Sequence, residues 1–176
     1  MSRFVPTMYK KNIFEIDYEK LKKENVKVLL FDFDNTIIEK GNYVVSKKTV
    51  TLFNKLKKDF LIYVVSNSLN EKKLNTVCKK LEIPYIGDSR KPLKKGYKKL
   101  KFKGIKNNQI AMIGDQLITD IWGANRMGYI SILVDPMTNN EHVFTKFNRV
   151  FECVILKVKK QEIRKIFRFF FRAAVV

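Results

Sequence analysis

Short apolar runs alternate with segments of helical periodicity along most of the chain. The runs predict five strands, at Val26–Phe33, Leu61–Val65, Pro84–Ile86, Ile110–Ile113 and Tyr129–Val134. They are brief, uninterrupted by charge after their first residues and rich in Val, Ile, Leu and Phe. Such runs are typical of strands that are buried on both faces of a parallel sheet.

The segments between the runs carry apolar residues at helical spacing. We expect helices at Tyr18–Lys23 with Asp17 as the N-cap, after a cap at Ser46, at Asn70–Leu81, at Pro92–Phe102, and at Thr119–Met127 with Gly128 as the stop. Residues 1–25 are a polar and aromatic lead-in. Strands that alternate with helices predict an α/β, doubly wound, Rossmann-like fold with a five-stranded, mainly parallel sheet.

Polar residues follow the predicted strands, at the carboxyl ends where α/β sheets bind their ligands. The candidates are Asp32, Asp34 and Thr36 after the first strand, Ser66 and Asn67 after the second, Lys91 after the third, and Asp115 and Asp120 after the fourth.

These residue types suit phosphate chemistry in the presence of a metal. Asp32 and Asp34 point to the same side of the strand and repel each other, and a hard cation such as Mg²⁺ would relieve that repulsion. A hydroxyl with backbone N–H groups, as at Ser66, can hold a phosphate, which Lys91 can neutralise. Each residue alone could be a turn, a helix cap or a surface lysine. Their succession at four strand ends is what metal-assisted phosphoryl transfer through an aspartyl intermediate requires.

The same residues resemble the four motifs of the haloacid dehalogenase (HAD) superfamily of phosphatases. Asp32-Phe33-Asp34-Asn35-Thr36, Ser66, Lys91 and the segment Gly114–Asp120 occur in that family's order. The stretches Val65–Asn67, Ile83–Pro84, Arg90–Pro92 and Thr145–Arg149 extend the likeness to the YqeG-type subclass IIIA phosphatases. That group includes phosphatidylglycerophosphate phosphatases.

The resemblance implies a role for each residue. Asp32 would be the nucleophile, and Asp34 would be the general acid and then the base. Mg²⁺ would be held by Asp32, by the backbone carbonyl of Asp34 and by Asp115, with Asp120 as a further ligand or as an orienting group. Ser66 and the backbone of Asn67 would bind the phosphoryl oxygens, Lys91 would balance charge, and Thr36 would shape the loop.

The family's cap domains are inserted at two places, and both are short in this chain. Only Glu39–Val45 follows the first strand, and Gly87–Ser89 leads directly to Arg90. We therefore expect no cap domain and an open site, which suits a macromolecule or a lipid headgroup.

Charge is the abnormal feature of the composition. The 176 residues include 36 Lys and Arg against 17 Asp and Glu, which gives a formal net charge of +19. This excess favours anionic partners such as nucleic acid, anionic lipid or phosphorylated substrates. Lysine used as a default surface residue explains the total equally well.

Part of the excess lies in a distinct C-terminal segment. We expect a phosphatase domain at residues 1–150 and a basic amphipathic helix within residues 151–176. Seven basic residues lie between Lys157 and Arg172, and Ile163, Ile166, Phe167 and Phe170 form an apolar stripe. This pattern favours an anionic membrane surface. Packing on the domain is the main alternative, and nucleic-acid binding without a recognised RNA motif is the third.

The sequence predicts a cytoplasmic enzyme that is peripheral at the inner face of the membrane. No signal peptide or transmembrane run is apparent, and the two cysteines, Cys78 and Cys153, suggest no disulfide framework. The leading hypothesis is an Mg²⁺-dependent hydrolase that converts phosphatidylglycerophosphate to phosphatidylglycerol. The alternatives are a phosphatase of a soluble sugar phosphate or nucleotide, and an RNA- or ribosome-associated protein on the same fold.

Overall fold

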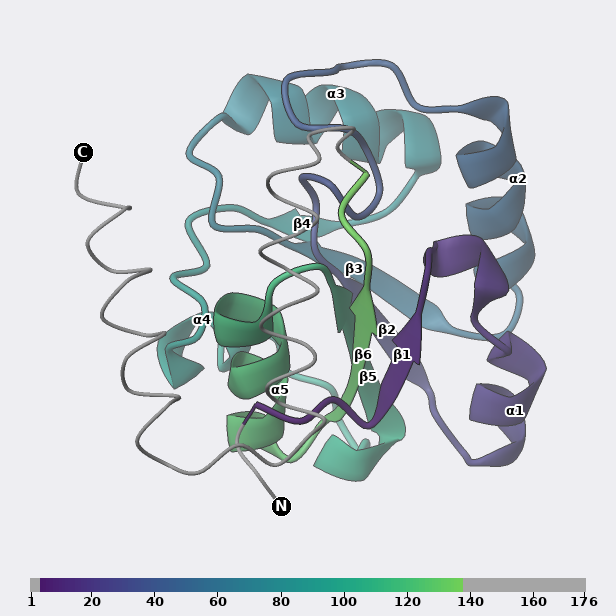
Figure 1. Cartoon of the computed structure of the whole chain (residues 1–176), viewed down its shortest axis with the longest axis vertical. Coiled ribbons are helices and arrows are strands. Elements are labelled where there is room, and N and C mark those ends of the chain that lie inside the picture. Colours follow the sequence, from purple (N-terminus) through teal and green to yellow (C-terminus); the bar gives the residue numbers. More distant parts are fainter. Residues whose placement is uncertain (1–3, 138–176) are drawn as a thin grey trace. The chain divides into compact units, whose positions relative to one another are not determined.

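Six parallel strands form one sheet in the order β1-β6-β5-β2-β3-β4 (Figure 1). The computed structural model describes residues 4–137. The strands are β1 (Met8–Lys10), β2 (Val28–Phe31), β3 (Leu61–Val65), β4 (Tyr85–Ile86), β5 (Ile110–Gly114) and β6 (Ile130–Val134). The chain runs outward from β2 to β4, crosses to β5 and continues to β6. The point where the direction reverses therefore lies between β2 and β5.

Helices cover both faces of this sheet. They are α1 (Tyr18–Lys23), α2 (Lys47–Leu56), α3 (Glu71–Leu81), α4 (Lys94–Tyr97) and α5 (Trp122–Met127), with short 3₁₀ turns η1 (Ile13–Glu15) and η2 (Asn107–Gln109) and the π-helical turn η3 (Leu117–Ile121). The helices α1 to α3 lie on one side, and α4 and α5 lie on the other (Figure 1).

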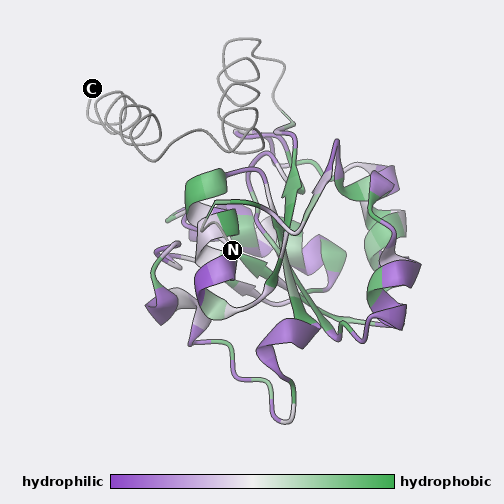
Figure 2. Cartoon of the chain, turned by 60° about the horizontal axis from the view of Figure 1, so that its bottom comes forward, coloured by the Kyte–Doolittle hydropathy of each residue, from purple (hydrophilic) through white to green (hydrophobic). Residues whose placement is uncertain are grey.

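Alternate residues of the strands supply the two layers of core. Leu29 and Phe31 of β2 face the cluster that contains side chains of α1, α2 and α3. Val28 and Leu30 face the second cluster, with Tyr97 of α4 and Ala124 of α5. Figure 2 shows the hydrophobic strands running between helices whose outward sides are hydrophilic. Burial on both faces explains why the strands read as continuous apolar runs.

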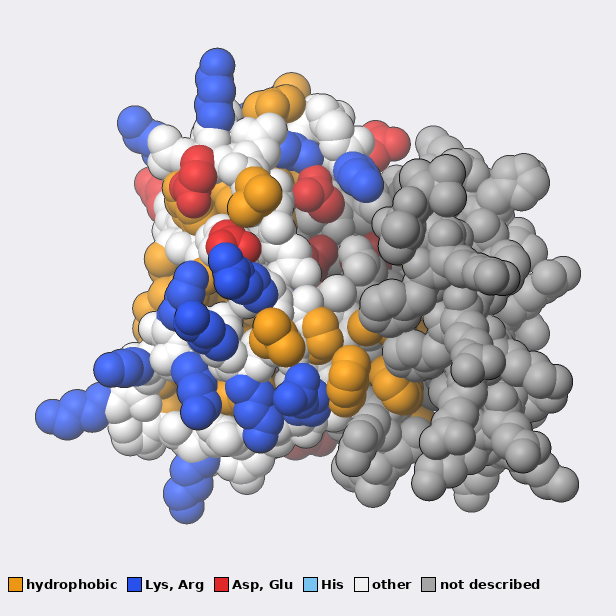
Figure 3. Space-filling model, turned by 90° about the vertical axis from the view of Figure 1, so that its left-hand side faces the viewer, with side chains coloured by type: hydrophobic (Ala, Val, Ile, Leu, Met, Phe, Trp, Pro, Cys, Tyr) orange, Lys and Arg blue, Asp and Glu red, His pale blue; other side chains and the backbone are white. Residues whose placement is uncertain are grey.

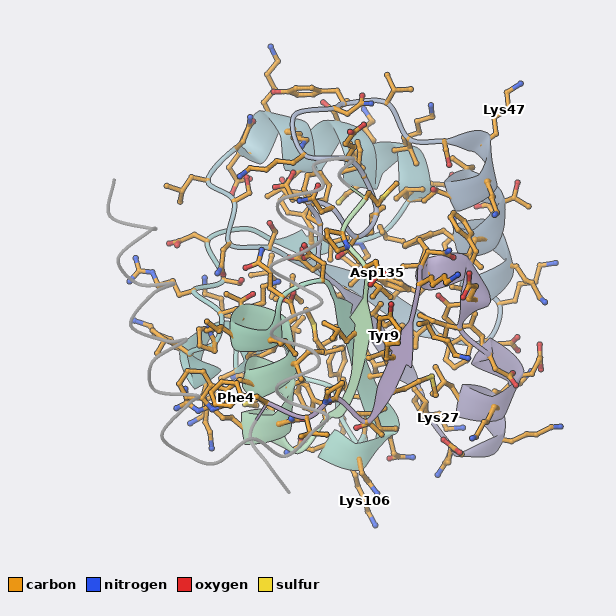
Figure 4. The ribbon with its side chains drawn as sticks, viewed as in Figure 1. Phe4, Tyr9, Lys27, Lys47, Lys106 and Asp135 are labelled. Carbon is orange, nitrogen blue, oxygen red and sulfur yellow. The ribbon has the colours of Figure 1, made fainter. Side chains whose placement is uncertain are left out.

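The predicted fold class is confirmed, with one strand more than expected. The sixth strand, β1, lies in the polar and aromatic segment that we had treated as a lead-in, and it pairs with β6 at the sheet edge. Its residues are only partly buried, so its sequence lacks a continuous apolar run. Tyr9 adds a side-chain contact, since its hydroxyl donates to Oδ1 of Asp135, just after β6, at 2.8 Å (Figure 4).

Two predicted helices were wrong in extent. The helix expected over Pro92–Phe102 spans only Lys94–Tyr97, because Gly96 disfavours a helix and the following lysines give a second turn little to bury. The helix expected at Thr119 starts instead with the turn η3, where the N–H of Ile121 donates to the carbonyl of Gln116. The caps predicted at Asp17 and Ser46 and the stop at Gly128 are present, and Asn70 caps α3.

Neither expected insertion point holds a cap. In the part of the chain that the structure describes, no helix or strand lies within Glu39–Val45 or Gly87–Ser89. Cys78 is buried and unpaired. No helix within residues 4–137 is long and apolar enough to cross a bilayer. Cys153, the Thr145–Arg149 segment and the expected basic helix lie outside the described residues, and the helix and the boundary at residue 150 stay predictions.

Candidate active site

The site is built on the carboxyl end of β2, one of the two central strands. Asp32 follows the last residue of β2, and its backbone N–H donates to the carbonyl of Ile113 on β5 at 2.8 Å. Asp32 therefore lies where the chain direction reverses, which is the usual ligand position in open α/β sheets. Its side chain is buried.

A lysine lies between two buried carboxylates. Lys91 Nζ is 2.5 Å from Oδ1 of Asp32 and 2.7 Å from Oδ1 of Asp120. All three side chains are at most 9% exposed. Buried charges are tolerated when they are paired and hydrogen-bonded, so the contacts hold the three groups in one arrangement.

Asn67 fixes the chain that carries Lys91. Its Oδ1 accepts hydrogen bonds from the backbone N–H of Lys91 at 2.7 Å and from the Ser89 hydroxyl at 2.9 Å. Its Nδ2 donates to the carbonyl of Lys91 at 3.0 Å. We expected Asn67 to act through its backbone on a phosphate, and the structure adds a side-chain role that the sequence did not indicate.

Asp115 and Asp120 approach the same point from β5 and η3. Carboxylate oxygens of Asp32, Asp115 and Asp120 lie within 4.8 Å of one another, and all three residues are buried. Gly114 permits this approach, because a Cβ there would be 2.3 Å from Oδ2 of Asp120. The backbone N–H of Gln116 donates to that same oxygen at 3.1 Å.

The donor set fits a divalent cation. Oδ1 of Asp115 is buried and has no hydrogen-bond partner among the described residues. An unpaired buried oxygen beside two further carboxylates is a costly arrangement that a hard cation relieves. Asp34 does not add its carboxylate to this group, consistent with the backbone role that was expected of it.

Burial also shifts the acid–base properties of the cluster. Burial, with the charge of Asp120 and against the charge of Lys91, raises the pKa of Asp32 to about 6. Burial raises the pKa of Asp115 to about 8, and the charges of Asp120 and Asp32 add to this. Burial would lower the pKa of Lys91, but its two carboxylate neighbours outweigh burial and hold that pKa above the ordinary value. Lys91 is therefore a permanent cation.

Asp34 lies apart from the cluster and has a partner of its own. Its Oδ1 accepts a hydrogen bond from Lys73 Nζ of α3 at 2.7 Å. Lys73 was not among the predicted site residues, because it lies in a run of charged residues. The signal was present in the periodicity, because Lys73 is four residues before Val77 on the buried side of α3.

Ser66 and Thr36 occupy the expected loops. Ser66 is buried, and its hydroxyl accepts a hydrogen bond from the Ser68 N–H at 3.0 Å. Thr36 is buried, and within residues 4–137 its hydroxyl has no partner. Both hydroxyls are therefore buried, in the loops that follow β2 and β3.

Comparison with known proteins identifies the class and then the family. The chain is a phosphatase by class, because the family model that it matches and its relatives are phosphatases. Residues 1–138 match the family described as mitochondrial PGP phosphatase, and the chain belongs to that family.

Two relatives show how closely the chain follows them. It is 35% identical over 160 residues to the Bacillus subtilis protein named "Probable phosphatase YqeG", covering 90% of this chain and 93% of that one. It is 26% identical over 150 residues to phosphatidylglycerophosphate phosphatase 1, chloroplastic/mitochondrial, of Arabidopsis thaliana. That match covers 80% of this chain and 43% of the Arabidopsis protein.

Two solved structures share the fold. The structure described as the HAD-hydrolase YfnB from Bacillus subtilis, bound to magnesium, matches with a TM-score of 0.52 at 12% identity. It covers 69% of this chain and 99% of its own. A HAD phosphatase from Thermococcus onnurineus also gives 0.52, at 16% identity, with 62% of this chain and 86% of that chain covered.

Proposed function

We propose that this phosphatase is an Mg²⁺-dependent phosphomonoester hydrolase that works through an aspartyl-phosphate on Asp32. The observation that carries the proposal is the buried cluster of Asp32, Lys91, Asp115 and Asp120 at the carboxyl edge of the sheet. Lys91 holds one oxygen of Asp32, so the other is available to attack. A pKa of about 6 leaves Asp32 mostly ionised near neutral pH.

Asp32 and Asp34 divide the reaction in this proposal. A carboxylate oxygen of Asp32 bonds to phosphorus, and the bond from phosphorus to the leaving oxygen breaks with its electron pair on that oxygen. Asp34, as the acid, gives this oxygen a proton. Asp34 then takes a proton from water, whose oxygen attacks phosphorus. The bond to Asp32 breaks, and phosphate is released.

Magnesium would be held by carboxylate oxygens of Asp32 and Asp115 and by the backbone carbonyl of Asp34. Asp120 is close enough to be a ligand, but it also accepts hydrogen bonds from Lys91 and from the Gln116 N–H. We assign it to orienting Lys91 and the metal's ligands. When bound, the cation would offset the negative charge of the acids and of the phosphoryl group.

The substrate that we favour is phosphatidylglycerophosphate, which would give phosphatidylglycerol. Its support is the family match and the activity for which the Arabidopsis relative is named. The absence of a cap within residues 4–137 also suits a headgroup that stays in its bilayer. Five exposed apolar residues lie in the loops around the site, where they could enter an interface: Tyr43, Val44, Leu69, Leu93 and Met137.

A lysine-rich segment that begins just after Lys91 in the chain supports the same substrate class. Seven exposed lysines and no acid lie between Leu93 and Lys106, which follow Lys91 in the chain: Lys94, Lys95, Lys98, Lys99, Lys101, Lys103 and Lys106. Figure 3 shows Lys and Arg side chains gathered on the face that carries α4. Anionic lipid attracts such a surface by about 1 kcal/mol for each lysine near it.

Phosphate release from phosphatidylglycerophosphate in mixed micelles with Mg²⁺ tests the proposal. We expect turnover by the full chain and its loss, by at least about a thousandfold, in Asp32→Asn. Asp59→Asn, an exposed acid away from the cluster, is the control and should keep full activity. Turnover of soluble sugar phosphates or nucleotides, with no turnover of phosphatidylglycerophosphate, would refute the substrate. Activity that survives Asp32→Asn would refute the mechanism.

A further inference from the structure

Two lysines are buried within residues 4–137, and the proposed chemistry uses only one of them. Lys91 serves the nucleophile, whereas Lys73, at the start of α3, pairs with Asp34. Neighbouring Lys72 is exposed. Burying an ammonium group is costly unless it is paired, so the position of Lys73 requires an explanation.

The surroundings of Lys73 restrain it on several sides. Its Nζ lies 5.2 Å from the centre of the Phe33 ring and 5.8 Å from that of Tyr43. The Tyr43 hydroxyl accepts a hydrogen bond from Nδ2 of Asn70 at 3.1 Å. Oδ1 of Asn70 caps α3 by accepting from the backbone N–H of Lys73 at 3.0 Å. The loop after β2, the helix cap and the lysine therefore form one connected unit.

This unit holds Asp34 by one of its two oxygens. Oδ1 of Asp34 contacts Lys73, and Oδ2 has no hydrogen-bond partner among the described residues. The Lys73 side chain is 6% exposed and that of Asp34 is 29% exposed, so the carboxyl group is fixed from behind while it remains accessible. A proton donor needs this combination, because small displacements are costly in proton transfer.

We propose that Lys73 is the positioning residue for Asp34, which it holds at the leaving oxygen of the substrate. The inference rests on the proposed function, since it presumes that Asp34 gives the leaving group its proton. Lys73 itself touches neither substrate nor phosphorus. Its loss should therefore slow leaving-group departure only where a proton is needed.

The test compares 4-nitrophenyl phosphate, whose leaving group departs readily without a proton, with unsubstituted phenyl phosphate, whose leaving group needs one. The quantity to measure is kcat/KM, which reports only the steps up to leaving-group departure. In Lys73→Met of the full chain we expect kcat/KM for phenyl phosphate to fall about tenfold, and for 4-nitrophenyl phosphate to stay within about twofold. Lys73→Arg should restore most of the loss, and Lys72→Met should change neither value.

Asp34→Asn separates the inference from the function on which it rests. This variant should also depress phenyl phosphate selectively, and adding Lys73→Met to it should have no further effect. If Asp34→Asn is selective and Lys73→Met lowers both substrates equally, Lys73 is only structural and the inference is overturned. If Asp34→Asn shows no selectivity, the acid role of Asp34 fails and the inference falls with it. Thermal unfolding of each variant identifies any that does not fold.

Discussion

Two ion pairs of equal length lie in very different surroundings. Lys91 Nζ is 2.7 Å from Asp120 in the site, and Lys57 Nζ is 2.7 Å from Glu82, where α2 and α3 end. The first pair is 1% and 0% exposed, and the second is 26% and 78% exposed. Distance alone would rank them as equals.

Burial makes the difference, because water screens one pair and not the other. Around Lys91 burial raises the pKa values of Asp32 and Asp115 to about 6 and about 8, and the charges of neighbouring acids add to this. Around Lys57 the solvent absorbs most of the interaction. The same kind of ion pair is therefore part of a reactive centre where it is buried and a weak surface contact where it is exposed.

The largest effect on stability and turnover is expected when the buried lysine, Lys91, is replaced. In Lys91→Met the carboxylates of Asp32 and Asp120 lose their shared cation, and we expect the free energy of unfolding without metal to fall by about 3 kcal/mol. Turnover should fall at least about a hundredfold, because phosphoryl transfer at Asp32 then lacks its countercharge. Urea unfolding and phosphate release measure the two effects. A Lys91→Met variant as stable as the parent chain would show that this pair is no more than a surface contact.

The site residues also differ in whether the sequence predicts them. The strands after which the site residues lie follow from continuous apolar runs, and Asp32, Lys91, Asp115 and Asp120 follow from their places at strand ends. Lys73 was not predicted, since the helical spacing that places it on the buried side of α3 does not indicate its partner, Asp34. The contact from Asn67 to Lys91 depends on a loop path that no local pattern encodes.

The stability of the buried cluster should depend on pH, and magnesium should change that dependence. Asp115 has its pKa raised to about 8, so without metal the folded chain binds more protons than the unfolded chain between about pH 4 and pH 8. Stability without metal should therefore fall as pH rises through this window, by at least about 5 °C in unfolding temperature. Saturating Mg²⁺ should offset the loss increasingly toward pH 8, because it needs the ionised carboxylate.

Scanning calorimetry from pH 5 to pH 9, with and without Mg²⁺, measures this dependence. Asp115→Asn is the control, since an amide cannot titrate; it should flatten the profile between about pH 6 and pH 8 and remove the effect of the metal. Stabilisation by Mg²⁺ that is equal at pH 5 and pH 8 would contradict the assignment of Asp115 as a ligand.

Exposed lysines should contribute to binding, where a partner excludes water from them, and not to the stability of the fold. Replacing Lys94, Lys95, Lys98 and Lys99 by Gln should leave the unfolding temperature unchanged. It should weaken binding to vesicles that contain phosphatidylglycerol by at least about tenfold at low salt. Sedimentation with vesicles measures this, and neutral vesicles provide the baseline. The matched control replaces four exposed lysines of other segments, Lys23, Lys27, Lys55 and Lys58, by Gln. Equal weakening by both sets would mean that only total charge matters.

The smallest effect is expected at the exposed pair of Lys57 and Glu82. Lys57→Met and Glu82→Gln each remove the ion pair, yet we expect no measurable change in unfolding temperature. An exposed ion pair adds little stability, because both charged groups are also well hydrated when they are apart. The change Lys57→Met matches Lys91→Met in side-chain chemistry, but Lys57 contacts one carboxylate and the carbonyl of Leu81, whereas Lys91 contacts two carboxylates. Unfolding temperatures at low and high salt should coincide for Lys57→Met and the parent chain. A loss at low salt that matches that of Lys91→Met would mean that burial does not decide the strength of these pairs.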